Sequence, residues 1–90
     1  MPDEYKTPKI TLRIVSQEGK CAFGHEAGQE FDVSGATPVG LCASAYHCAY
    51  PYIFALKWGG QMPWEKEKGT AHVACPDAKN PVVMKIIREG

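Results

Sequence analysis

Four cysteines and three histidines are the side chains of this 90-residue chain that are best suited to chemistry. Thiols and imidazoles bind soft and borderline metal ions, and a thiolate is also a nucleophile. They are Cys21, His25, Cys42, His47, Cys48, His72 and Cys75, and most of them lie where a loop, a strand or a helix is expected to begin or end. Because they belong to separate segments, only a specific fold would bring them to one site.

Three of the thiols and one imidazole form the main candidate site. Cys21 and His25 make a C-x-x-x-H pair in a glycine-containing loop, Cys42 opens an apolar run, and Cys75 ends an expected strand. Three sulfur ligands and one imidazole suit tetrahedral zinc, or iron. The sequence therefore predicts a metal site formed by Cys21, His25, Cys42 and Cys75, although no C-x-x-C pair of the zinc-finger kind is present.

Cys42 also supports a second interpretation, in which the protein is a thiol-based enzyme or redox protein. If a helix begins just before Cys42, the free N–H groups and the dipole of its first turn favour a thiolate there. His25 would then act as the base, and Cys21 or Cys75 as the resolving thiol. The plain alternative is that Cys42 is a small core residue, since free cysteine is among the most buried residue types.

The other cysteine and the other histidines are expected to lie outside the site. Cys48 is six positions from Cys42, which on a helix is about 240° around the axis, so the two thiols face different ways. His72 precedes Cys75 by three residues, and an odd spacing on a strand places side chains on opposite faces. We therefore expect Cys48 to be a spare thiol or to fill space in the core, and His47 and His72 to be surface or packing histidines.

Four segments have the patterns of strands, and these must position the site. Residues 9–15 have the pattern of a strand with one buried face, because Ile10, Leu12 and Ile14 alternate with the polar residues Lys9, Thr11 and Arg13. Three further strands are predicted at residues 29–33, 71–75 and 82–88. The last two are separated by turn residues at 76–81, which favours an antiparallel hairpin.

One helix is predicted between the second and third strands. Thr37 is suited to the N-cap and Pro38 to the first helical position. An apolar stripe of period 3.6 follows, made of Leu41, Cys42, Ala45, Tyr46, Ala49, Ile53 and Leu56. Pro51 predicts either a kink or two abutting helices, and Gly59 is suited to end the helix.

The resulting order of elements, β-β-α-β-β, predicts an α+β fold in which a kinked helix covers one face of the sheet. Ninety residues are the length of one domain, so we expect a single domain over residues 1–90. A domain of this size has a modest core, and a bound metal ion or a dimer contact would stabilise it.

Charge and hydropathy exclude several classes of function. Ten basic residues balance ten acidic ones, so no basic surface for nucleic acid or an anionic membrane is expected. No apolar run is long enough to span a membrane. The polar start at residues 1–6 differs from a secretory signal, which predicts a cytoplasmic protein whose cysteines are thiols or ligands. Two disulfide bridges are the alternative for a secreted form.

A third interpretation is a non-catalytic interaction module whose cysteines are structural. The run from Tyr46 to Trp58 is rich in aromatic residues, and Met62-Pro63-Trp64 follows it. This is more apolar surface than one side of a small helix buries, so a homodimer or another protein partner is expected.

Four motifs together resemble a family of small bacterial and archaeal proteins, often from anaerobes. The motifs are C-x-x-G-H-x-x-G-x-x-F from Cys21 to Phe31, P-x-G-L-C-x-x-A from Pro38 to Ala45, Pro51 with Gly59-Gly60, and C-P-D from Cys75 to Asp77. The resemblance covers nearly the whole chain and implies Cys21, His25, Cys42 and Cys75 as the site residues, with His47, Cys48 and His72 outside the pattern. No activity is established for that family, so the resemblance implies no mechanism.

Overall fold

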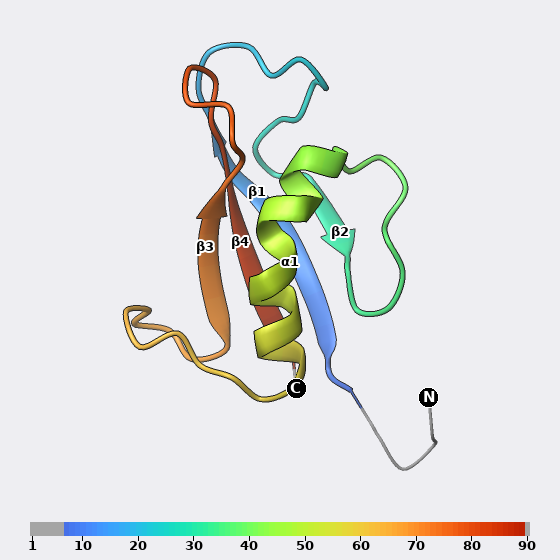
Figure 1. The fold of residues 1–90 in the computed structure, drawn as a ribbon, viewed down its shortest axis with the longest axis vertical. Coiled ribbons are helices and arrows are strands. Elements are labelled where there is room, and N and C mark those ends of the chain that lie inside the picture. The colour runs from blue at the N-terminus through green and yellow to red at the C-terminus, as the bar shows by residue number, and fades with distance from the viewer. Residues whose placement is uncertain (1–6, 90) are drawn as a thin grey trace.

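Strand β1 (Lys9–Gln17) contains the alternating segment and supplies three core side chains. Its Ile10, Leu12 and Ile14 are fully buried, because every second residue of a strand points to the same face. The computed structural model describes residues 7–89, so the polar segment 1–6 lies outside the described residues. The other elements are β2 (Glu30–Asp32), α1 (Ala43–Lys57), β3 (Thr70–Ala74) and β4 (Val82–Glu89) (Figure 1).

The four strands form one antiparallel sheet in the order β2-β1-β4-β3. Strands β1 and β4 pair along almost their whole length, with Leu12 opposite Ile86. The predicted hairpin around residues 76–81 is confirmed, since Ala74 pairs with Val83 across it. The predicted α+β fold with the order β-β-α-β-β is therefore confirmed.

Helix α1 covers one face of the sheet and packs against β1, β3 and β4 (Figure 1). Its buried side chains all belong to the predicted apolar stripe: Ala45, Ala49, Ile53 and Leu56. They meet the buried side chains of the two central strands, which are Ile10, Leu12, Ile14, Val82, Met84 and Ile86. The hydrophobic core therefore lies between the helix and one face of the sheet.

The helix begins later than the sequence predicted. Gly40 has a φ of 88°, a left-handed conformation through which no right-handed helix continues. The prediction of Thr37 as N-cap and Pro38 as first helical residue is therefore wrong. Cys42, with φ −58° and ψ 134°, is the N-cap residue, so it lies where the first N–H groups of the helix are free.

Pro51 lies inside α1, which is one continuous helix and not two abutting ones. The predicted end is confirmed, because Gly59 has a φ of 92° and its N–H donates to the carbonyl of Leu56. The guanidinium of Arg88 on β4 also donates to that carbonyl, at 2.9 Å, which ties the end of the helix to the sheet. Over residues 7–89, no helix has the length and apolarity to cross a membrane.

Three segments that are far apart in the sequence meet at one end of the sheet. The loop after β1, the loop between β3 and β4, and the first turn of α1 all lie at the top of Figure 1. Backbone hydrogen bonds join two of them, since the N–H of Glu18 donates to the carbonyl of Pro81 at 3.0 Å. The predicted site residues belong to these three segments.

Candidate functional site

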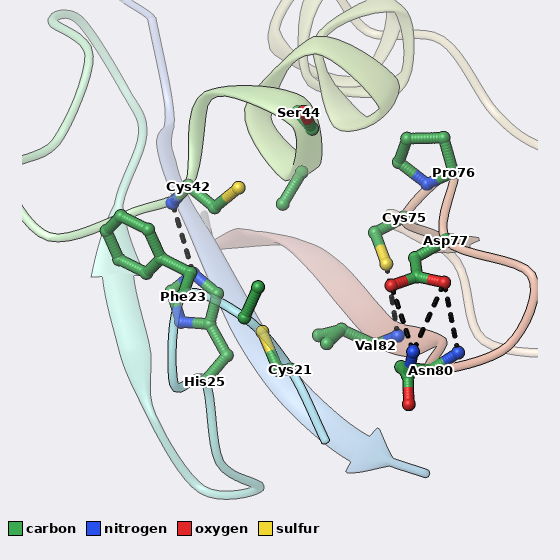
Figure 2. Close-up of a pocket in the computed structure, with 12 residues that line it drawn as sticks. Cys21, Phe23, His25, Cys42, Ser44, Cys75, Pro76, Asp77, Asn80 and Val82 are labelled. Atoms are coloured by element: carbon green, nitrogen blue, oxygen red, sulfur yellow. Dashed lines mark hydrogen bonds between the residues drawn. The ribbon is translucent and has the colours of Figure 1, made fainter. Parts of the chain in front are cut away.

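The residues Cys21, His25, Cys42 and Cys75 all line one pocket at this end of the sheet, with a volume of about 300 Å³ (Figure 2). Cys21 and His25 come from the loop after β1, Cys42 from the N-cap of α1, and Cys75 from the position after β3. The three cysteines are free thiols and are half-buried. The fold thus turns three thiols from distant segments toward the same space.

Cys21 is a thiol whose pKa the fold lowers. The backbone N–H of His25 has the largest effect, and the N–H groups of Phe23 and Gly24 add to it, because a hydrogen bond stabilises the negative charge of a thiolate. Partial burial and the nearby carboxylate of Asp77 raise the pKa and oppose this effect. With its pKa lowered on balance, Cys21 is more readily a thiolate, the form that attacks electrophiles and binds metal ions.

The side chain of His25 is buried and has a hydrogen-bond partner at each ring nitrogen. Its Nε2 accepts from the backbone N–H of Cys42 at 3.0 Å. Its Nδ1 lies 2.9 Å from Oε1 of Gln29, and since that oxygen only accepts, Nδ1 carries the proton. The ring stacks on Phe23, with centroids 4.8 Å apart, and meets the edge of Phe31 at 5.8 Å. His25 therefore fastens the loop after β1 to the start of α1.

Cys42 is positioned through its backbone. As the N-cap residue it donates its N–H to His25, while its side chain makes no capping hydrogen bond. Its side chain lines the pocket (Figure 2). The sequence assigned the activated thiolate to Cys42, whereas the structure lowers the pKa of Cys21 by surrounding it with N–H groups.

Cys75 takes part in the last rung of the β3–β4 hairpin through its sulfur. Its N–H donates to the carbonyl of Val82 at 2.9 Å, and the N–H of Val82 donates to Sγ of Cys75 at 3.2 Å. A carbonyl oxygen would accept that second hydrogen bond in a regular ladder, so the rung holds the sulfur at a defined place. Hydrogen bonds of this kind are among the means by which proteins tune thiolate ligands of metals.

A side-chain link joins the loops that carry Cys21 and Cys75. Oδ1 of Asn80 accepts the backbone N–H of Lys20 at 2.8 Å, next to Cys21. Asn80 itself is fixed by Asp77, whose Oδ1 accepts the Asn80 backbone N–H at 3.2 Å and whose Oδ2 accepts its side-chain amide at 3.2 Å (Figure 2). The link fixes the two loops relative to each other, and with them the two thiols.

The charges around the pocket favour a cation. Asp77 carries the only formal charge among the residues that line it, and the thiolates would add further negative charge. No three Cys, His, Asp or Glu side chains within residues 7–89 are already placed to share one ion. Coordination by the three thiols would therefore require their sulfur atoms to move from these positions.

The remaining cysteine and histidines lie away from the pocket. His47 is exposed on α1, and Cys48 is half-buried on the same helix. His72 is exposed, with Nδ1 2.9 Å from Oε1 of Glu65. His47 and His72 thus lie on the surface, and Cys48 is not among the buried residues of the core.

The contacts of four residues around the site were not predicted from the sequence: Phe23 and Gln29 contact His25, and Asp77 and Asn80 join the two loops. The turn chemistry of residues 76–81 indicated a loop, and Asp77 and Asn80 do form its internal hydrogen bonds. Nothing local indicates that Asn80 reaches Lys20 or that Gln29 reaches His25. No protein-family model, no curated protein and no solved structure matches the chain.

Proposed function

We propose that the protein binds a soft or borderline metal ion, zinc or iron, through the thiolates of Cys21, Cys42 and Cys75, in a structural or redox-linked role. The observation that carries the proposal is the convergence of these three thiols on one pocket. Thiolates are the preferred protein ligands of zinc and of iron in iron–sulfur sites. His25 is the fourth ligand that the sequence predicts, and to bind an ion it would have to give up one of its two partners.

Two further observations support a cation in the pocket. The lowered pKa of Cys21 makes a thiolate available before any ion binds. Deprotonation of all three thiols would otherwise gather negative charge next to the carboxylate of Asp77, which a divalent cation neutralises. When bound, such an ion would cross-link three segments of a small domain.

Metal analysis of protein purified without chelators, both aerobically and anaerobically, tests the proposal. We expect about one zinc or iron ion per chain in at least one preparation, as for other thiolate sites. Cys21→Ser, Cys42→Ser and Cys75→Ser should each lower the metal content sharply, whereas Cys48→Ser is the matched control and should retain it. Metal-free protein in both preparations that also fails to take up added zinc would refute the proposal.

A second candidate function is thiolate chemistry in metal-free protein, with Cys21 as the attacking thiol. The specific observation is the N–H groups of Phe23, Gly24 and His25 that lower the pKa of Cys21. A resolving thiol would be Cys42 or Cys75, which line the same pocket. Mass spectrometry after brief treatment with a low-molecular-weight disulfide would show a mixed disulfide at Cys21 first, and equal labelling of Cys21 and Cys48 would count against this function.

A third candidate is self-association through α1. Four aromatic side chains follow one another along α1 and its C-cap at intervals of four residues, with neighbouring rings in tilted or edge contact: Tyr46, Tyr50, Phe54 and Trp58. Phe54 is 53% exposed, and Tyr50 and Trp58 are 47% exposed. A homodimer would form on this surface, and sedimentation of the wild type against Phe54→Ser measures it. A monomer at tens of micromolar in both proteins would exclude this candidate.

We also propose a cytoplasmic location. All four cysteines are free thiols, and a reducing compartment keeps them in that state. The balanced charge of the chain supports neither nucleic acid nor an anionic membrane as a partner. Fractionation of cells that express the protein without a tag tests the location.

A further inference from the structure

We propose that two copies of the chain pair through α1 in antiparallel orientation, with Trp58 of each copy seated in a hollow beside the N-terminal half of the other copy's helix. The inference rests on self-association through α1, the third candidate function, and names the contacts that would form the dimer. The surface concerned is the aromatic ladder, which is made by four side chains along α1 and its C-cap: Tyr46, Tyr50, Phe54 and Trp58.

The outer side of α1 has the composition of an interface. Within residues 7–89, no strand or second helix lies over that side of the helix (Figure 1). The outer face of a surface helix normally carries charged residues, yet Lys57 is the only charged side chain of α1. Phe54 is nevertheless 53% exposed, and Tyr50 and Trp58 are 47% exposed. An equally uncharged surface therefore fits this face better than a charged partner does.

The exposed area of the aromatic ladder suits the centre of a dimer interface of ordinary size. Since an aromatic side chain has about 150–250 Å² of surface, Tyr50, Phe54 and Trp58 together leave roughly 300 Å² open to solvent on each copy. A stable interface buries about 800 Å² per partner and consists of an apolar core with a polar rim. The ladder thus supplies the apolar core, and the polar residues beside it would form the rim.

The spacing of the aromatic ladder determines how two copies pack. Residues four apart form a ridge on a helix, and two such ridges interdigitate when the helix axes cross at about 50°. A two-fold axis at the middle of the ladder places Tyr50 of one copy opposite Phe54 of the other. The two Lys57 residues are then about 15 Å apart along the helix, beyond the screening length of about 10 Å. A parallel pair would bring both lysines to the same end, so the antiparallel pair is favoured.

A hollow on the same surface fits the last side chain of the aromatic ladder. It has a volume of about 550 Å³ and is lined by Thr37, Ala43, Tyr46, His47, Tyr50 and Pro51. The antiparallel arrangement places Trp58 of one copy opposite Tyr46 of the other, and therefore at this hollow. The two-fold axis repeats the contact at the other end of the interface. Each copy thus carries both an exposed ring and a cavity for its partner's ring, as a closed two-fold dimer requires.

Opposite charges introduced in two separate full-length variants test the arrangement. Tyr50→Glu and Phe54→Lys should each weaken self-association by about tenfold, because each buries a charge that has no partner. In an equimolar mixture, antiparallel pairing brings the introduced carboxylate opposite the introduced ammonium group and keeps one contact between Tyr50 and Phe54. We expect the mixed dimer to form about tenfold more tightly than either variant alone. Sedimentation equilibrium of the wild type, both variants and their mixture measures the four affinities.

Two further variants complete the experiment, with circular dichroism confirming that each protein is folded. Ala43→Leu fills part of the hollow and should weaken the dimer, whereas Val15→Lys, at an exposed apolar residue of β1, should leave it unchanged. An unchanged dimer in Ala43→Leu would overturn the seating of Trp58.

The other outcomes separate the inference from the candidate function on which it rests. Variants Tyr50→Glu and Phe54→Lys that each lose the dimer and do not associate with each other would overturn antiparallel pairing and leave self-association through α1 intact. A dimer that neither variant weakens, or a wild type that is monomeric at tens of micromolar, would overturn both.

Discussion

At the scale of single residues, the thiol of Cys21 differs from the others through its backbone surroundings. The N–H groups of His25, Phe23 and Gly24 stabilise its thiolate, and they do so because the loop closes through a hydrogen bond from Gly24 N–H to the Cys21 carbonyl at 3.0 Å. The peptide groups are dipoles at fixed positions, so the effect needs no charged neighbour. The shape of its loop thus lowers the pKa of the Cys21 thiol.

Alkylation by iodoacetamide should therefore be faster at Cys21 than at Cys48 in metal-free protein near neutral pH. The lowered pKa places the rise in the rate for Cys21 at a lower pH than the rise for an ordinary thiol. Peptide mass spectrometry of samples quenched at several pH values measures both rates in one experiment. Coincident pH profiles for the two thiols would contradict the expectation.

The same lowered pKa has a consequence for stability. A thiol with a folded-state pKa below its unfolded-state pKa stabilises the fold fully above the unfolded-state value. That contribution is lost as the pH falls through the folded-state pKa. Cys21→Ser should therefore show a smaller gain in unfolding free energy between acidic and mildly alkaline pH than the wild type shows. Urea titrations of both proteins at a series of pH values measure the difference.

His25→Leu should lower the free energy of unfolding by about 1–3 kcal/mol, because the part-buried N–H of Cys42 would lose its acceptor. His47→Leu is the matched control on exposed surface, and its effect should stay within about 0.5 kcal/mol. Urea denaturation followed by circular dichroism measures both. Equal effects of the two substitutions would show that His25 has no structural role.

At the scale of elements, the site depends on how two loops are joined. Gly19 has a φ of 67°, and a Cβ atom at this position would overlap Oδ1 of Asn80. That oxygen is the acceptor that links the loop of Cys21 to the loop of Cys75. A glycine is therefore required where the two loops approach each other.

Gly19→Ala should destabilise the protein by about 1–3 kcal/mol, from the positive φ and the displaced Asn80. Under the proposed function it should also weaken metal affinity, because the hydrogen bond that joins the loops of Cys21 and Cys75 would be lost. Gly35→Ala is the matched control, since nothing lies within 4 Å of its added methyl group. An unchanged metal affinity in Gly19→Ala would show that the hydrogen bond between the two loops does not position the thiols.

At the scale of the whole molecule, metal binding and folding should be coupled. The three thiols come from the loop after β1, the start of α1 and the end of β3, so the site forms only when the sheet and helix are assembled. A chain of 90 residues buries a modest core, and a ligand that binds only the folded state stabilises it by mass action.

Zinc at about a thousand times its dissociation constant should raise the free energy of unfolding by about 4 kcal/mol. Thermal unfolding with added zinc, and again after removal of zinc by a chelator, measures the gain and its reversal. Magnesium is the control, since it prefers oxygen ligands and should have no effect. A melting temperature that zinc leaves unchanged would contradict a site that spans the three segments.

Local patterns in the sequence were sufficient to predict the strands, the helix and their order. The alternation of Ile10, Leu12 and Ile14, the apolar stripe of the helix and the glycine at its end each depend on neighbours a few residues away, and such patterns predict structure well. The start of the helix was wrong because Thr37 and Pro38 have the right local chemistry, while the left-handed Gly40 ends any helix begun there.

The residue types also sufficed to single out Cys21, His25, Cys42 and Cys75, which the structure places around one pocket. The roles within that pocket were decided by the tertiary structure alone. The acceptor role of His25 toward Cys42, the link from Asn80 to Lys20 and the sulfur rung of Cys75 join residues from 7 to 60 positions apart. Such contacts leave no periodicity in the chain, because they arise only when pairing of the strands and packing of α1 on the sheet bring the loops to the same end.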